Sequence, residues 1–277
     1  MSRAPGAPAA RGPALGILTR APQPGRTKTR LAGAIGDTAA ADLATAMLLD
    51  TVEAVAAGDW QTTLFVEPAA GLETVRRLLE ASSTAAERSG QVDLHPQAPG
   101  DIGARMGAAA STLLHAGWAP VVLVGSDIPG LGRAQIATAV SALSGSALSS
   151  PDGSGPPGAD VVFGPADDGG YYLVGLRRLR AEREATLFGP TIAWGTGVVL
   201  AQSETAAARA GLRAGRVDAQ SDIDTIVDLV SLRTRLAKAD THVRIAGPRT
   251  RAVVATLHLD TVNPDGARPA ANEEQSR

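Results

Sequence analysis

Four cationic side chains lie in a short segment that directly follows the apolar run 15–18; they are Arg20, Arg26, Lys28 and Arg30. Guanidinium and ammonium groups donate charge-assisted hydrogen bonds to phosphate oxygens. Gly25, within the same segment, would let the backbone approach a ligand closely. The segment contains neither a G-x-G-x-x-G pattern nor the spacing of a Walker A loop. Its composition therefore predicts a phosphate-binding turn, with a solvated basic turn as the alternative.

An aspartate, Asp127, follows the apolar run 121–125 in the sequence VVLVGSDIPGL. A run this apolar is typical of a strand in the middle of a sheet. A carboxylate at the end of such a strand needs a group that binds it. A hard divalent cation that also binds phosphates is such a group, so Mg²⁺ or Mn²⁺ is expected. The alternative is that Asp127 caps the next helix, although Gly132 and Arg133 lie nearer to where that helix should begin.

Two further acids lie in the segment SDIDT, before the last helical pattern. Asp222 and Asp224 alternate with Ile223, as residues at the end of a strand do. Thr225 begins a capping-box-like pattern, which explains that residue structurally. Asp222 or Asp224 can then complete a metal site with Asp127, and the sequence does not decide between the two.

The segment Asp167-Asp168-Gly169-Gly170 lies between two apolar runs and is followed by two tyrosines. Asp-Gly and Gly-Gly pairs are common in hairpin turns, which is the structural interpretation. The segment also suits a ligand, because the amides of Gly169 and Gly170 could receive a ligand oxygen. Asp168 is the acid expected to face that ligand, as a base or as a binding group.

The elements that must position these residues alternate along the chain. Strands are expected at 14–19, 61–67, 91–97, 120–127, 159–166, 169–176 and 212–219, and helices at 37–57, 71–82, 101–117, 133–145, 198–211 and 225–239. Strands separated by long helices indicate a mostly parallel sheet that is covered on both faces. In such a Rossmann-like, three-layer α/β/α sandwich, ligands bind at the carboxyl ends of the strands. The cationic turn and the acids are all expected at that edge.

The composition narrows the class of protein and its location. The 277 residues carry a formal net charge of -2 and include no cysteine. The near-neutral charge gives no reason to expect nucleic acid or an anionic membrane as a partner. Disulfides, zinc–thiolate sites and cysteine nucleophiles are excluded. The sequence shows no signal-peptide pattern and no membrane-spanning run, so a cytoplasmic location is expected.

One main domain is expected at 14–240. The Ala/Pro/Gly-rich tail at 1–13 is expected to be disordered, and the C-terminal extension at 241–277 partly so. A Gly/Ser/Pro-rich segment at 144–159 is expected to form a flexible loop within the main domain.

Taken together, the motifs resemble the transferases of the DUF2064 family, also called rSAM/selenodomain-associated transferase 1. Those proteins have the GT-A, or nucleotide-diphospho-sugar transferase, fold. The matching stretches come in the family's order between about Leu15 and Leu236, and they are APQPGRTKTRLAGAIG, DIGARM, GSDIPGL, VVFGPADDGGYYLVGL, LFGPTIAWGTG and DIDTIVDL. The resemblance implies a nucleotide-dependent transferase across the main domain.

The chain also resembles, more distantly, the guanylyltransferases of deazaflavin-coenzyme biosynthesis and the molybdenum-cofactor nucleotidyltransferases. They share a Lys-Ser/Thr-Arg-Leu element, an Asp-x-Pro-x-Leu element and a late Asp-x-Asp-Thr element. This resemblance implies that Lys28 and Arg30 contact nucleotide phosphates and that Asp127 binds Mg²⁺ together with Asp224 or Asp222. The stretch WGTG, which begins at Trp194, differs from their Trp-Ser-Thr-Pro pattern. The resemblance is therefore weaker in the part of the site that would bind the acceptor.

Two reactions use this fold. Nucleotidyl transfer from a nucleoside triphosphate expels pyrophosphate, whereas glycosyl transfer from a nucleotide sugar expels the nucleotide. The clustered cations suit charge that builds on departing pyrophosphate. A glycosyltransferase would favour Asp-x-Asp where this chain has Ser126-Asp127-Ile128. Both points favour nucleotidyl transfer.

The sequence therefore predicts transfer of a nucleotidyl group to a small phosphorylated or hydroxyl acceptor. Lys28, Asp127 and Asp168 are the expected catalytic residues. The acceptor-side residues are expected to be Asp168, Gly169, Gly170, Tyr171 and Trp194. Glycosyl transfer and non-catalytic nucleotide binding remain the alternatives, and no feature of the sequence indicates the oligomeric state.

Overall fold

The computed structural model describes residues 11–55, 58–82, 92–145, 158–177, 181–238, 245–257 and 259. Within them, seven strands form one sheet in the order β3-β2-β1-β4-β6-β5-β7. The strands are β1 (Ala14–Arg20), β2 (Gln61–Glu67), β3 (Val92–Pro96), β4 (Val121–Gly125), β5 (Val161–Pro165), β6 (Tyr171–Leu176) and β7 (Ala214–Arg216). β6 runs antiparallel to both of its neighbours, and the other pairs are parallel. The sheet is mostly parallel, as the alternation of strands and helices predicts.

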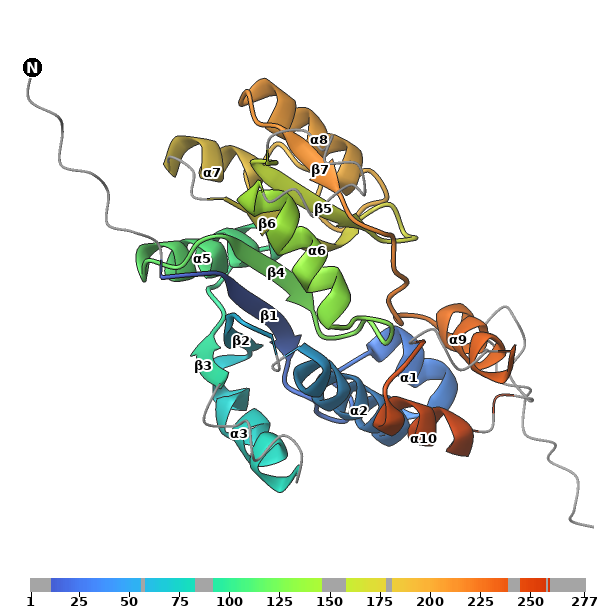
Figure 1. Cartoon of the computed structure of the whole chain (residues 1–277). Helices are drawn as coiled ribbons and strands as arrows, with labels where there is room; N and C mark the ends of the chain where they lie inside the picture. Colours follow the sequence, from blue (N-terminus) through green and yellow to red (C-terminus); the bar gives the residue numbers. More distant parts are fainter. Residues whose placement is uncertain are drawn as a thin grey trace, which may run out of the picture.

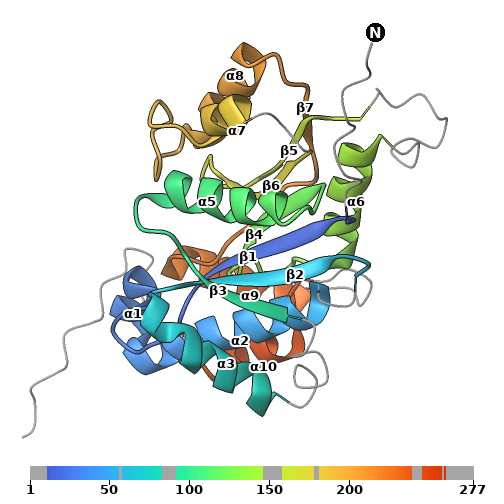
Figure 2. The ribbon, with the colours of Figure 1, turned by 90° about the vertical axis from the view of Figure 1, so that its left-hand side faces the viewer.

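Helices cover both faces of the sheet (Figure 1). One face carries α2 (Asp37–Val55), α3 (Leu72–Ala81) and α6 (Arg133–Ser144), and the other carries α5 (Ile102–His115), α7 (Ala181–Leu187) and α8 (Val199–Arg209). Figure 2 shows α5 and the pair α2 and α3 on opposite sides of the central strands. Each face buries its own apolar cluster, so the expected α/β/α sandwich is confirmed.

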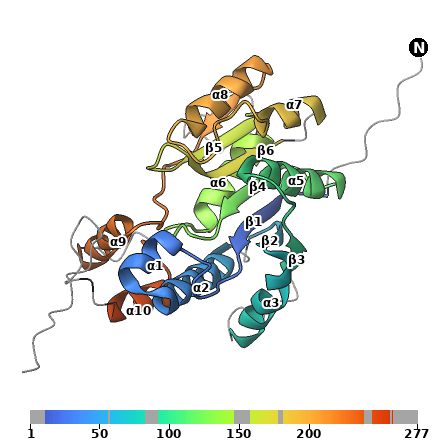
Figure 3. The ribbon, with the colours of Figure 1, turned by 180° about the vertical axis from the view of Figure 1, so that it is seen from behind.

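A further apolar cluster lies at the end of the sheet to which β1 points (Figure 3). It joins α2 to α1 (Thr29–Ile35), α9 (Ile226–Lys238) and α10 (Pro248–Thr256). The carboxylate of Asp50, which is 2% exposed, accepts hydrogen bonds from the amides of Arg249 and Thr250, at 3.2 and 2.8 Å. A carboxylate at the N-terminus of a helix is stabilising, and here it anchors α10 on α2.

All of the predicted strands and helices are present, and their ends differ by a few residues. The helices α1, α7 and α10 are additions to the predicted set. In the tail, the amide of Arg11 donates to the carbonyl of Gly117, and its guanidinium lies 5.2 Å from the ring of Trp118. Residues 1–10 of the tail, most of the loop at 144–159 and most of the extension at 241–277 lie outside the described residues. No described helix combines the length and the apolarity needed to cross a membrane.

Candidate functional site

The cationic segment forms a tight turn between β1 and α1. The buried hydroxyl of Thr27 donates to the carbonyl of Ala21 and accepts from the amide of Gln23, both at 3.0 Å. Gly25 has a φ of 73°, a conformation that favours glycine. Thr27 therefore holds the turn from inside, so the cations project from a defined backbone.

Lys28 is directed into the site by its backbone. It has φ 52° and ψ 46° at the N-cap of α1, and it is the only non-glycine residue with a positive φ in the described ranges. This left-handed conformation costs an L-residue about 1–2 kcal/mol. Its Nζ lies 2.7 Å from Oδ2 of Asp127 and 2.7 Å from Oδ1 of Asp224. Strain of this kind is found mainly at functional sites.

The ammonium group of Lys28 is held in its charged form. Its side chain is only 9% exposed. Burial alone would lower the pKa of Lys28, but the charges of Asp127 and Asp224 outweigh burial and raise the pKa above its usual value. Lys28 is therefore a fixed positive charge between two carboxylates.

Asp127, Asp222 and Asp224 form one acidic cluster, in which one carboxylate oxygen of each lies within 4.8 Å of the others. The backbone brings them together, because the amide of Ile223 donates to the carbonyl of Asp127 at 3.2 Å. Ile223 is fully buried, so the two acids beside it point the other way. Asp127 does not cap α6, which begins at Arg133.

The acids of the cluster differ in their affinity for a proton. Burial, followed by the charges of Asp127, Asp168 and Asp224, raises the pKa of Asp222 to about 6. For Asp224, burial would also raise the pKa, but the charge and hydrogen bond of Lys28 outweigh it and lower the pKa below its usual value. Asp222 therefore keeps its proton to a higher pH than Asp224 does.

The donor set of this cluster fits a hard divalent cation, because Mg²⁺ and Mn²⁺ prefer carboxylate oxygens. The three carboxylates and the ammonium of Lys28 together carry a formal excess of two negative charges, which a divalent cation would neutralise. Lys28 bonds one oxygen of Asp127 and one of Asp224, so a cation would share these carboxylates with it.

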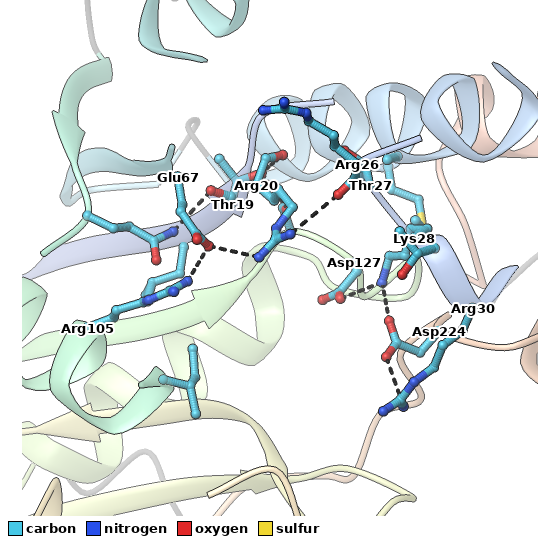
Figure 4. A pocket seen from close by; sticks show the side chains of 17 residues that line it. Thr19, Arg20, Arg26, Thr27, Lys28, Arg30, Glu67, Arg105, Asp127 and Asp224 are labelled. Atoms are coloured by element: carbon cyan, nitrogen blue, oxygen red, sulfur yellow. Dashed lines mark hydrogen bonds and ion pairs between the residues drawn. The ribbon is translucent and has the colours of Figure 1, made fainter. Parts of the chain in front are cut away.

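A pocket of about 520 Å³ extends from the acidic cluster along the end of β1 (Figure 4). At the far end from Lys28, Arg20 and Arg105 both bind Glu67: Nη2 of Arg20 lies 3.2 Å from Oε2, and Nη1 of Arg105 contacts the same oxygen. Arg20 also donates to the carbonyl of Arg26 at 3.3 Å, which braces the turn. Arg105 and Glu67 are not among the site residues predicted from the sequence, although Arg105 lies in the stretch DIGARM.

This first pocket is cationic. Its charged lining residues are Arg20, Arg26, Lys28, Arg30, Arg105, Glu67, Asp127 and Asp224. Five cationic side chains oppose three carboxylates, which leaves a formal excess of two positive charges. The four predicted cations all line the pocket, whereas Gly25 lies in the turn and not among the lining residues. Figure 4 shows the side chain of Arg26 extending away from Lys28 and the acidic cluster.

A second pocket of about 440 Å³ adjoins the first, and both are lined by Asp127, Asp224 and Arg30. The acidic cluster therefore lies at the boundary between two cavities. The second pocket is also lined by four of the predicted acceptor-side residues, namely Asp168, Gly170, Tyr171 and Trp194, and by Asp222.

Gly169 and Gly170 serve the hairpin between β5 and β6. Gly169 has a φ of 86°, and a Cβ there would lie 2.1 Å from the carbonyl oxygen of Gly197. The amide of Gly169 donates to the carbonyl of Ala166 at 3.2 Å, and that of Gly170 to Oδ1 of Asp168 at 2.8 Å. Both amides are bonded within the hairpin, so a ligand oxygen would have to compete with these bonds, and its binding there stays a prediction.

Tyr171 and Trp194 form an aromatic wall of the second pocket, with ring centroids 6.4 Å apart and ring planes at 81°. The indole of Trp194 lies against Gly103 of α5, where a Cβ would come within 2.2 Å of it. The hydroxyl of Tyr171 is buried near Ser203, and burial raises the pKa of Tyr171 above its usual range. Tyr171 therefore contributes its ring, not an ionised hydroxyl.

The fold is shared with solved transferases. A protein from Desulfovibrio desulfuricans G20, provisionally assigned as a nucleotide-diphospho-sugar transferase, is 25% identical, with a TM-score of 0.66 over 88% of this chain and 96% of its own. A cytidylyltransferase from Leptospira borgpetersenii serovar Hardjo-bovis is 11% identical, with a TM-score of 0.49 over 88% and 92%. The second likeness is too remote to bear on activity. The protein therefore has the nucleotide-diphospho-sugar transferase fold, and the expectation of a transferase is confirmed.

The chain belongs to the family described as "Uncharacterized protein conserved in bacteria (DUF2064)", whose pattern matches residues 48–196. This confirms the resemblance that the motifs suggest. The cationic turn at 20–30 and the acids at 222–224 lie outside the matched range, so their part in the site rests on the geometry described above. No curated protein matches the chain significantly.

Proposed function

We propose that this chain is a metal-dependent transferase that moves a nucleotidyl group from a nucleoside triphosphate to a small acceptor. The observation that carries the proposal is the cationic excess of the first pocket beside the acidic cluster. The terminal phosphate of a triphosphate brings about two negative charges at neutral pH. Those charges match the two surplus cations of the pocket, whereas a nucleotide sugar lacks that terminal phosphate.

In this proposal the first pocket binds the phosphates of the donor. Arg26 and Arg30 are exposed and can turn toward the β- and γ-phosphates, and Arg30 also lies 3.8 Å from Oδ2 of Asp224. Arg105 and Arg20 are held in place by Glu67 at the other end of the pocket, where they limit how the donor lies. Charge that grows on the departing pyrophosphate is stabilised by cations that are already positioned.

Asp127 with Asp222 or Asp224 would hold Mg²⁺ or Mn²⁺, which when bound would neutralise phosphate charge and polarise the bond to the α-phosphate. Lys28 keeps Asp127 and Asp224 oriented toward the boundary between the two pockets. Asp168, on the far wall, receives the proton when the acceptor is a hydroxyl. The roles of Asp127 and Asp168 are those expected from the sequence, whereas Lys28, which is expected to contact phosphates, here binds two carboxylates.

Glycosyl transfer from a nucleotide sugar is the second candidate. It is favoured by the likeness to the Desulfovibrio protein at a TM-score of 0.66. The same acids and the same second pocket would serve this reaction, with the sugar carbon in place of the α-phosphate. Fewer cations would then be needed, because the departing nucleotide carries one phosphate fewer than a triphosphate.

A thermal-shift screen distinguishes nucleotidyl transfer from glycosyl transfer. Nucleoside triphosphates and nucleotide sugars are compared with and without Mg²⁺, and released pyrophosphate is measured once a donor is found. We expect stabilisation by at least one triphosphate that depends on Mg²⁺. Stabilisation by nucleotide sugars and by no triphosphate would replace nucleotidyl with glycosyl transfer. Arg26→Gln, which removes one cation from the first pocket, should weaken the stabilisation by the triphosphate, whereas Arg77→Gln, on the exposed face of α3 away from both pockets, should not.

A further inference from the structure

The second pocket differs from the first in the sign of its charge. Its charged lining residues, within the part of the chain that the structure describes, are Arg30, Asp127, Asp168, Asp222 and Asp224. One guanidinium therefore faces four carboxylates, and it already lies 3.8 Å from Oδ2 of Asp224. Even a divalent cation on the acidic cluster would leave this pocket without surplus positive charge.

Four backbone amides in the walls of this pocket are already hydrogen-bonded within the protein. The amides of Gly169 and Gly170 are bonded within the hairpin. On the opposite wall, the amide of Trp194 donates to the carbonyl of Ile192 at 2.9 Å, and that of Ala193 donates to the side chain of Gln202 at 2.6 Å. A bound phosphate needs several free donors aimed at it. These four amides are occupied, and Arg30 is the one cationic side chain among the described residues that line this pocket.

The remaining wall of the second pocket is apolar and includes an aromatic side chain. Trp194 is half-buried, and Ile102 at the start of α5 is 43% exposed, large for an apolar side chain. Met106 and Val199 continue this surface, and the ring of Tyr171 supports Trp194 from the side. An indole face beside a few polar groups is typical of sites that bind small molecules with an apolar face.

We infer that the acceptor is an uncharged hydroxyl compound with one apolar face, such as a sugar or a cyclic polyol, and not a phosphorylated compound. This inference rests on the proposed function, since an acceptor presupposes a donor. The hydroxyl oxygen of the acceptor forms a bond to the α-phosphorus while the bond to the β-phosphate oxygen breaks. Pyrophosphate leaves, and the hydroxyl proton passes to Asp168. A phosphorylated acceptor would instead bring its charge against four carboxylates.

The test reads binding at Trp194 directly. Trp60→Phe with Trp118→Phe leaves Trp194 as the one tryptophan of the chain, and its fluorescence is titrated with matched pairs: glucose against glucose 1-phosphate, and myo-inositol against its monophosphate. The titrations are run with saturating donor, so that the phosphate esters cannot respond through the first pocket, and again without donor. Unfolding midpoints show whether the double variant keeps its fold. We expect the neutral member of a pair to bind at least tenfold more tightly.

Asp168→Asn supplies the charge test, because asparagine can still accept the hydrogen bond from the amide of Gly170. This variant should bind the phosphate ester more tightly, so the preference for the neutral compound over its phosphate ester should fall several-fold. Asp167→Asn is the matched control: Asp167 bonds Ser221 and does not line this pocket, so the preference should not change.

Equal or tighter binding of the phosphate esters overturns the inference. So does a lack of response to both neutral compounds in protein that binds its donor. Donor binding has its own readout in the thermal shift. Its failure would count against the proposed function, while the titrations without donor would still report the preference at Trp194.

Discussion

The ammonium nitrogen of Lys28 lies 2.7 Å from Oδ2 of Asp127, a contact that joins residues 99 positions apart and links the cationic turn to the end of β4. The same nitrogen bonds Asp224, which precedes α9. Three segments that are distant in sequence thus meet at one protonated side chain. Four predictions test the roles of Lys28, of the acids beside it and of the elements that position them.

Replacing Lys28 by asparagine should impair the site more than the fold. Asparagine tolerates the left-handed backbone but leaves three carboxylates facing one another. Asp127 and Asp224 are 34% and 46% exposed, and water screens them, so the free energy of unfolding should fall by only about 1–2 kcal/mol. Transfer activity should fall about 100-fold. Urea denaturation and steady-state kinetics measure the two effects.

Lys28→Arg, which keeps the charge in a larger head group, should retain most of the stability lost in Lys28→Asn. An asparagine variant with full activity would show that the ammonium group has no part in transfer.

The raised pKa of Asp222 predicts a specific pH dependence. The pKa is about 6 in the folded chain and about 3.9 in an unfolded one. The folded state therefore binds more protons between these values, and the free energy of unfolding should fall as the pH rises from about 4 to about 6. Asp222 is half-buried, so screening limits the change to about 1 kcal/mol. Urea denaturation in metal-free buffer measures it.

Asp222→Asn should remove that slope, while the titration of Asp224, whose pKa is lowered, remains at more acidic pH. Because a metal ligand must be deprotonated, Mn²⁺ affinity should fall about tenfold for each pH unit below 6. Metal affinity that is constant from pH 5 to pH 7 would exclude Asp222 as a ligand.

Gly103→Ala tests how the aromatic wall is positioned. The added Cβ would lie 2.2 Å from the indole of Trp194, so the ring must move. We expect the stability to fall by about 1–3 kcal/mol, with a shift of the fluorescence of Trp194 and unchanged donor binding. Gly33→Ala is the matched control, because its Cβ meets nothing within 4 Å and should stabilise α1 by about 0.5–1 kcal/mol. An unmoved fluorescence spectrum in Gly103→Ala would contradict the close contact.

Asp50→Ala tests the attachment of α10. It removes a buried carboxylate that accepts from the amide of Thr250 at 2.8 Å and from Arg249, whose guanidinium also binds Glu53. Loss of a buried partner for these donors should cost about 2–4 kcal/mol. Limited proteolysis should then cleave near α10 before the rest of the chain. Proteolysis at the wild-type rate would show that the apolar contacts of α10 are sufficient to hold it.

The element pattern could be predicted from local sequence because it depends on local chemistry. The run VVLVG has the composition of a buried strand. The alternation of Asp222, Ile223 and Asp224 places both acids on one side of the chain. For the same reason the residue types showed that phosphates and a metal are the ligands to expect. The helix α10 escaped prediction because its segment has little apolar periodicity, and its stability depends on Asp50, about 200 residues earlier.

The α/β architecture, the family and most of the charged residues at the carboxyl edge of the sheet can be predicted from the amino-acid sequence. How those charges are distributed depends on the tertiary structure. It placed Lys28 between Asp127 and Asp224, bound Arg20 and Arg105 to Glu67, and occupied the amides of Gly169 and Gly170 within a turn. The reason is physical: hydrophobic pattern and residue type act over a few neighbouring positions, whereas the partner of a charged side chain depends on where distant segments meet once the sheet has formed.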